Sequence, residues 1–330
     1  MTWIERLQSV FVAAAALAGL GVGLATPLGA SGEYVVIPAL LVMLIAVFVQ
    51  LDASNLKDVG NAKALVAVSL VLNYVFTPLL AWGLGIGLLG EQPDLRIGLL
   101  LLLVTPCTDW YLVFTAMARG HAGIATALLP VNLVLQLLLL PVYVMLLGGE
   151  AAMVDAGTLL EAVGLILLTP LGVAFILRWV SAGFKGRRWR EQHLMRWANR
   201  VVMPLLCLAV FAMFAWQAPV VAENGTEMLL LLPPLLLFFV ILPLTATGAA
   251  RLLHLPGPQR VTLTMVTTAR NSPIALGIAV AAFPDRPLIA VALVVGPLIE
   301  LPILAVLSQI IRHRDKGAPD EQAAVSIADR

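Results

Sequence analysis

Several reactive side chains stand close together in one segment of an otherwise apolar stretch, residues 104–120. Within five positions this segment carries two hydroxyls, a proline, a thiol and a carboxylate: Thr105, Thr108, Pro106, Cys107 and Asp109. The proline removes a backbone donor and disfavours helix at the residue before it. The thiol can act as a ligand, and the carboxylate can cap a following helix, bind substrate or carry a proton.

A second polar segment, TTARNSP (267–273), interrupts the apolar pattern in the second half of the chain. Asn271 and Ser272 precede Pro273, and we expect them to cap a helix, with substrate contact as a second role. Arg270 is expected either to compensate a buried carboxylate or to take part in substrate binding and coupling.

Three further polar side chains lie in apolar stretches. Glu300 stands between two prolines, and an ionisable residue at membrane depth is a functional candidate by default. Asn132 and Gln136 are four residues apart, so they share one helix face. Hydrogen bonding between helices is their simplest role. Cys207 lies in an ordinary apolar stretch, where we expect core packing.

The composition sets the class of protein. Of 330 residues, 61% are hydrophobic and 12% charged, and the mean hydropathy is +0.98. Soluble domains carry roughly 25% charged residues. The formal net charge of +1 gives no sign of nucleic-acid binding. The two cysteines suggest neither a disulfide framework nor a metal site, and we expect no cofactor.

Ten segments are long and apolar enough to cross a bilayer, which takes about 20 residues per helix. They lie near residues 8–29, 34–51, 62–89, 96–118, 122–147, 158–180, 200–221, 228–250, 260–283 and 287–311. The sequence therefore predicts an all-α polytopic membrane protein with ten transmembrane helices. Residues 316–330 are polar and are expected to form a disordered cytoplasmic tail.

Lysine and arginine gather in the loops on one side of these spans, and acidic residues gather on the other. Because cytoplasmic loops carry an excess of basic residues, the basic side is predicted to be cytoplasmic. Both termini then lie inside the cell, and the inner membrane is the expected location. The basic loop 181–200 divides the spans into two sets of five.

The two sets of spans look like repeats. Residues 35–49 match residues 201–215, and the Val-Thr pair at 104–105 matches the pair at 266–267 at nearly the same offset. Since five spans is an odd number, the second copy enters the membrane from the opposite side.

We therefore predict two inverted five-helix repeats, residues 1–150 and 151–315. The polar segments fall in the fourth and ninth spans, which are predicted to be discontinuous helices that cross near the midplane. Such breaks are tolerated where they face protein or water. At a crossing, Asp109 and Arg270 are expected to compensate each other, because an unpaired charge there is costly.

Three segments resemble the arsenical-resistance (arsenite) permeases and their relatives in the bile acid:sodium symporter superfamily: PCTDWYLVFTAMARGH (106–121), TTARNSP (267–273) and GPLIELPIL (296–304). The resemblance covers nearly all of the ten-span chain. It implies an inverted-repeat fold of panel and core domains, with fourth and ninth helices that unwind and cross. It also implies that the functional cysteine of the arsenite permeases corresponds to Cys107.

The chain departs from the superfamily at several positions. Where arsenite permeases carry an acidic residue after the ninth-helix break, this chain has Ile274. A sodium-site glutamate and glutamine of the bile-acid branch correspond to Val266 and Arg270. The polar residues of that branch's other sodium site fall on Tyr111, Leu112, Ala125 and Leu129. We therefore expect transport without sodium coupling.

We interpret the chain as a secondary active transporter rather than an enzyme, with arsenite or a related metalloid as the first-choice cargo for efflux. Neutral arsenous acid is a soft electrophile, so Cys107 is the expected arsenite ligand, and a single thiol suits reversible binding. Four further side chains complete the predicted substrate site: Thr105, Thr108, Asn271 and Ser272. A proton is the candidate coupling ion, with Asp109 or Glu300 as its carrier.

Two other readings stay open from the sequence. In an organic-anion carrier, Arg270 and two helix N-termini would hold a carboxylate. A non-transporting receptor or scaffold is disfavoured, because repeated helix breaks would lower its stability without purpose. The expected partners are a small-molecule substrate and the lipid bilayer, with no nucleic acid and an open oligomeric state.

Overall fold

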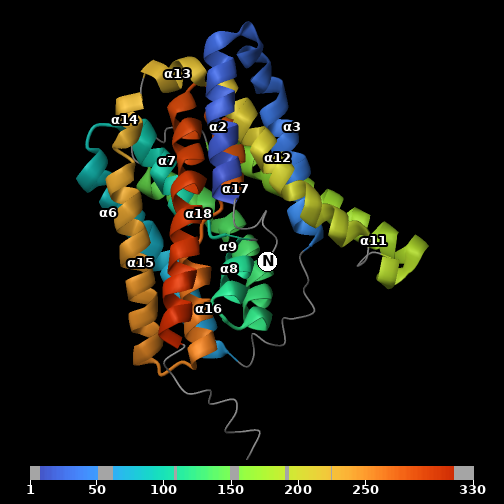
Figure 1. The fold of residues 1–330 in the computed structure, drawn as a ribbon, viewed down its shortest axis with the longest axis vertical. Helices are drawn as coiled ribbons and strands as arrows, with labels where there is room; N and C mark the ends of the chain where they lie inside the picture. The colour runs from blue at the N-terminus through green and yellow to red at the C-terminus, as the bar shows by residue number, and fades with distance from the viewer. Residues whose placement is uncertain are drawn as a thin grey trace, which may run out of the picture.

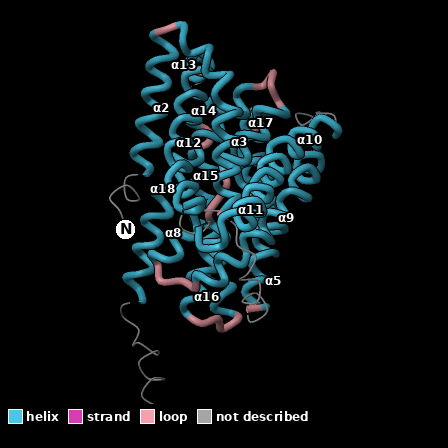
Figure 2. Tube along the Cα trace, turned by 90° about the vertical axis from the view of Figure 1, so that its right-hand side faces the viewer, coloured by secondary structure: helices cyan, strands magenta, loops and turns pink. Residues whose placement is uncertain are grey.

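The computed structural model describes residues 8–50, 62–107, 110–148, 156–189, 193–223 and 225–315. Within these ranges the chain is helical nearly throughout, and no strand is formed among the described residues. Figure 1 shows most helices running roughly along one long axis, with α11 projecting to the side, and in Figure 2 most loops lie at the two ends of that axis.

The described residues of the first half form nine helical segments. They are α2 (Gln8–Ala25), η1 (Pro27–Gly32), α3 (Glu33–Val49), α5 (Lys63–Val71), the π-helical η3 (Leu72–Phe76), α6 (Thr77–Leu89), α7 (Pro93–Val104), α8 (Trp110–Met117) and α9 (Ala122–Leu147).

The second half is described in ten helical segments. They are α10 (Ala156–Val163), the π-helical η5 (Gly164–Leu168), α11 (Thr169–Trp189), α12 (Met195–Trp216), α13 (Ala218–Glu223), α14 (Gly225–Leu229), α15 (Leu232–Leu252), α16 (Gly257–Thr268), α17 (Ser272–Ala282) and α18 (Pro287–Asp315).

Seven helices in the described residues are long and apolar enough to cross a membrane: Pro27–Val49, Lys63–Leu89, Ala122–Leu147, Glu161–Ser181, Met195–Trp216, Leu232–Leu252 and Pro287–Arg312. Each matches a predicted span. The spans predicted at 96–118 and 260–283 are not continuous helices, since each divides into two short ones. The span predicted at 8–29 corresponds to α2, whose apolar part covers Ala13–Ala25.

Helix α12 lies against α2 and α3, and glycines let the helices approach closely. A Cβ atom added to Gly19 or Gly23 would lie 2.2 Å from a backbone carbonyl oxygen of α12. Small residues four apart bring membrane helices into backbone contact in this way. Any larger side chain on this face of α2 would push the two helices apart.

Four short helices occupy the interior of the molecule. The last turns of α7 and α16 are buried, as is nearly all of α17. Around them, α6 and α18 pack on α7, α15 packs on α16, and α8 contacts α9 and α16. The described non-helical residues beyond α7 (105–107) and between α16 and α17 (269–271) are buried by protein, which is the condition under which such backbone is tolerated at membrane depth.

Candidate functional site

The two helix breaks meet inside the molecule. Helix α7 ends at Val104 and helix α16 ends at Thr268. Just beyond these ends, Pro106 and Arg270 face each other as an isolated antiparallel bridge. Proline cannot donate a backbone hydrogen bond, but a residue at a non-hydrogen-bonded position of an antiparallel pair needs no donor. The proline thus stops the helix without leaving a gap in the pairing.

Two backbone hydrogen bonds flank the bridge. The N–H of Cys107 donates to the carbonyl of Ala269 at 3.1 Å, and the N–H of Asn271 donates to the carbonyl of Thr105 at 2.8 Å. In continuous helices the first N–H would instead have reached the carbonyl of Leu103, and the second that of residue 267. We call the paired segments 105–107 and 269–271 the crossing. Their pairing directs each of these N–H donors to the other break and leaves carbonyls at the helix ends without their helical partners.

The side chain of Arg270 supplies the missing donors. Its Nη1 donates to the carbonyl of Leu103 at 2.8 Å, its Nε to the carbonyl of Thr268 at 3.3 Å, and its Nη2 to the carbonyl of Thr267. These carbonyls belong to the C-terminal ends of α7 and α16, where helix dipoles are negative. One guanidinium, 1% exposed, therefore holds both helix ends.

Two other elements reach the same side chain. Nη2 of Arg270 also donates to Oδ1 of Asn73 at 3.1 Å, and the guanidinium carbon lies 5.1 Å from the ring centroid of Phe238. Asn73 lies in η3, a single π-helical segment inside a long apolar span, and such segments are frequent at functional sites. Sequence reasoning missed Asn73, although an amide in the run VLNYVF was a possible signal.

Glu300 joins the site from α18. Its Oε1 accepts a hydrogen bond from the backbone N–H of Arg270 at 2.7 Å, and the residue is 3% exposed. A buried carboxylate is thus placed against the second break. The predicted partner of Arg270, Asp109, lies outside the described residues, as does Thr108, so the Asp109–Arg270 pairing stays a prediction.

The other predicted side chains of the breaks are also buried. Asn271 caps α17, since its Oδ1 accepts from the N–H of Ile274 at 3.1 Å. The hydroxyl of Thr105 donates back to its own helix, 3.0 Å from the carbonyl of Leu101. Ser272 Oγ has no hydrogen-bond partner among the described residues. The residue is 3% exposed.

Cys107 is fully buried within the first break, whereas Cys207 is half-buried in the middle of α12. Only the first of these thiols is therefore placed at the crossing. Among the described residues, no group of three or more His, Cys, Asp or Glu side chains could hold a metal ion.

The pair predicted on the fifth span lies on α9, and both side chains are buried. The hydroxyl of Tyr74 donates to the carbonyl of Asn132 at 2.8 Å, and the hydroxyl of Tyr143 donates to the carbonyl of Tyr74 at 2.6 Å. Gln136 lies between these contacts on the same face of α9. Its amide has no partner among the described residues, so its expected interhelical hydrogen bond is not formed.

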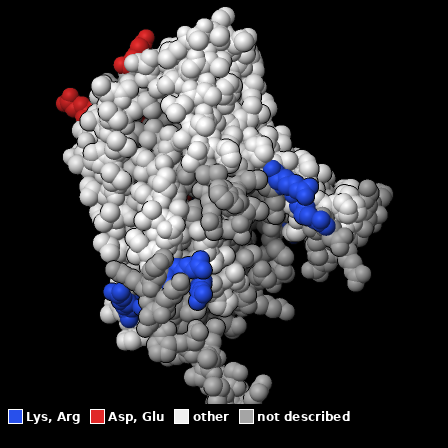
Figure 3. Space-filling view, in the orientation of Figure 1, with Lys and Arg blue, Asp and Glu red and all other residues white. Residues whose placement is uncertain are grey.

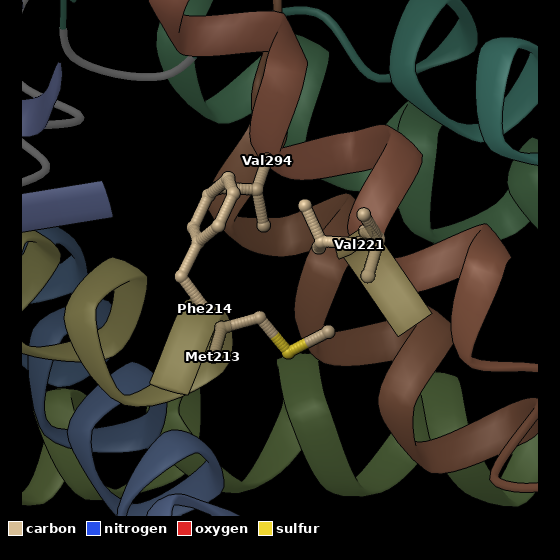
Figure 4. Close-up of a pocket in the computed structure, with 5 residues that line it drawn as sticks. Met213, Phe214, Val221 and Val294 are labelled. Atoms are coloured by element: carbon tan, nitrogen blue, oxygen red, sulfur yellow. The ribbon is translucent and has the colours of Figure 1, made fainter. Parts of the chain in front are cut away.

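A small pocket lies between α12, α13 and α18, and Figure 4 shows the side chains that line it. They are all apolar: Met213, Phe214, Val221, Val291 and Val294. No side chain there offers a hydrogen bond to a polar molecule. The crossing is therefore the better candidate for a site that handles polar cargo.

Comparisons with known proteins agree with a transport role. The Arsenical-resistance protein Acr3 of Corynebacterium glutamicum is 25% identical over 275 residues, which cover 80% of this chain and 74% of that protein. The Arsenical-resistance protein Acr3 of Alkaliphilus metalliredigens is 24% identical over 338 residues, 96% of this chain and 95% of that protein. An uncharacterized sodium-dependent transporter of Bacillus subtilis, YocS, is 24% identical over 247 residues, which cover 73% of this chain and 71% of that protein.

A family model matches a large part of the chain as well. The model of the Sodium Bile acid symporter family covers residues 37–224, more than half of the sequence. This match confirms the resemblance that the sequence segments carry. The protein is a multi-pass membrane transporter for a small-molecule substrate and not an enzyme, and it belongs to the Sodium Bile acid symporter family.

Proposed function

We propose that this transporter exports arsenite or a closely related metalloid as a secondary active carrier. The observation that carries the proposal is the position of Cys107, a buried thiol inside the first break and beside the backbone of the second. Two relatives that match most of the chain are named arsenical-resistance proteins, which supports the same cargo.

The chemistry at the crossing suits reversible capture of neutral arsenous acid. A sulfur–arsenic bond forms, one arsenic–oxygen bond breaks, and the thiol proton leaves with the hydroxyl as water. The remaining hydroxyls of the cargo can bind the Ser272 hydroxyl, which has no partner among the described residues, and the positive dipole ends at the N-termini of α8 and α17 favour the partly negative oxygens of the cargo. One sulfur ligand binds weakly enough for release on the other side.

The proposed architecture has ten spans in two inverted repeats of five, residues 1–150 and 151–315. The seven long helices supply seven spans, α2 supplies the first, and α7 with α8 and α16 with α17 supply the fourth and ninth. The matched breaks support this assignment, because each follows a buried helix of 12 residues that begins beside a proline. Their pairing at the bridge agrees with a crossing at the midplane.

The distribution of charged side chains supports the proposed orientation, in which the protein lies in the inner membrane with both termini in the cytoplasm. In Figure 3 the visible acidic side chains lie toward the upper end, and the basic ones lie at mid-height and below. Arg286, which lies on the acidic side, forms an ion pair with Asp94, and this carboxylate compensates its positive charge. The more basic end then faces the cytoplasm.

A proton is the proposed coupling ion, and sodium is not. Glu300 is a buried carboxylate in contact with the second break, so its protonation would change the charge at the crossing. Asp109 is the alternative carrier. An organic-anion carrier is the second candidate function, favoured by the family match. Its anion would bind at the N-termini of α8 and α17, since the guanidinium of Arg270 already donates to protein oxygens.

Flux into inside-out vesicles tests the proposal directly. We expect uptake of arsenite driven by a proton gradient, unchanged when sodium is replaced by choline, and lost in Cys107→Ser. Cys207→Ser is the matched control and should keep near wild-type flux, because that thiol lies outside the breaks. Full arsenite flux in Cys107→Ser would refute the thiol mechanism. Flux of carboxylates without flux of arsenite would establish the organic-anion function instead.

A further inference from the structure

Four oxygen atoms converge on the guanidinium of Arg270, and none of them belongs to a carboxylate. Three are carbonyls at the ends of α7 and α16, and the fourth is the amide oxygen of Asn73. Oxygen atoms of this kind are the usual ligands of hard cations in proteins. In transporters with discontinuous helices, unwound carbonyls and the C-terminal ends of half-helices coordinate the coupling cation. The crossing thus presents a cation site, and a side chain fills it.

The buried charges described around this site balance. The guanidinium contributes one positive charge, and Glu300, which accepts the backbone N–H of Arg270, contributes one negative charge. Both residues are at most 3% exposed. If the guanidinium were removed, a buried carboxylate and a set of unpaired carbonyls would be left, and both features favour uptake of a cation.

We propose that Arg270 is a tethered cation that permanently occupies a monovalent-cation site, and that removing its side chain converts the crossing into a site for sodium. The guanidinium neutralises the two helix ends in every state of the cycle, so the carrier needs no mobile cation to assemble its crossing. The inference rests on the sodium independence in the proposed function, but it does not depend on which substrate is carried.

The test is thermal unfolding of the purified full-length protein in detergent, measured in sodium, potassium and choline chloride. Wild type should show no sodium-specific change in its midpoint. Arg270→Ala should unfold at a lower temperature than wild type in choline, and sodium should raise its midpoint by several degrees in a saturable way, as expected for a ligand of the native state. Methylguanidinium should give a similar rise, because it restores the missing group.

Two variants serve as controls. Arg286→Ala removes an arginine from an ion pair near the end of the molecule and should show no response to sodium. The double variant of Arg270→Ala with Glu300→Gln removes both buried charges, so it should be more stable in choline than Arg270→Ala alone and should lose most of the sodium response.

Several outcomes would overturn the proposal. An equal midpoint for Arg270→Ala in sodium and choline would do so, and so would an equal sodium response in Arg286→Ala. Failure to recover folded Arg270→Ala in both sodium and methylguanidinium would also count against it, because either cation should restore the crossing. Failure of the arsenite assay would not touch this result, since unfolding is measured without substrate.

Discussion

The two helix breaks have similar backbone surroundings but carry different side chains. Helices α7 and α16 both end in a buried segment, and a threonine near each end donates its hydroxyl back to the preceding turn. Thr105 lies 3.0 Å from the carbonyl of Leu101, and Thr267 lies 2.8 Å from the carbonyl of Leu263. The two breaks therefore share this hydrogen bond.

The side chains that follow divide the work between the breaks. The second break carries Arg270, which holds both helix ends, and Asn271, which caps α17. The first break carries the thiol of Cys107 and Pro106, whose position in the bridge requires no backbone N–H. This difference indicates that the second break organises the crossing, whereas the first supplies the thiol that the proposed function assigns to the cargo.

The largest effect is expected when the two prolines are exchanged for alanine. Pro106→Ala adds a backbone N–H that is buried in the bridge or lets α7 run on through the break, and either result should cost about 1–3 kcal/mol. Pro273→Ala should cost less, because Pro273 lies in the first turn of α17, where N–H groups lack helical partners anyway. Thermal midpoints and arsenite flux of the two variants measure the difference. Equal losses of stability and flux in the two variants would mean that the two prolines have the same structural role.

The sequence indicated two breaks, because prolines and polar residues in apolar spans have a clear physical signature, and α7 and α16 end at those segments. Their crossing near the midplane stays a prediction. Pro106 and Arg270 were expected at the crossing, and they lie opposite each other. The seven long helices could also be predicted from hydropathy alone.

The partners of Arg270 could not be predicted in the same way. Sequence reasoning paired it with Asp109, which lies outside the described residues, so that pairing stays a prediction. The printed partners of the guanidinium, backbone carbonyls and Asn73, were not predicted. Every residue has a carbonyl, so a carbonyl carries no sequence signal, and its availability depends on where a helix ends. The contact of Glu300 with the break likewise depends on how α18 packs.

An intermediate effect is expected from the cap of the second break. Asn271→Ala removes the oxygen that accepts the N–H of Ile274, and loss of such a cap costs about 1 kcal/mol. Asn271→Ser should recover most of this loss, because serine is also a good cap. The two variants can be compared by thermal unfolding with and without arsenite. If serine restores stability but not arsenite flux, the amide also contacts cargo; if it restores neither, capping is not the main role.

The smallest effect should come from the paired threonines, and it tests how closely the two breaks match. Thr105→Val and Thr267→Val each remove a buried hydroxyl while keeping the shape of the side chain. A hydrogen bond of this kind contributes about 1 kcal/mol or less, so both midpoints should fall slightly and by similar amounts. Thr105 differs in one respect, since its hydroxyl also lies 3.4 Å from the carbonyl of Asn271 across the crossing. A clearly larger loss for Thr105→Val would show that this long contact stabilises the crossing, and that the first break takes part in organising it.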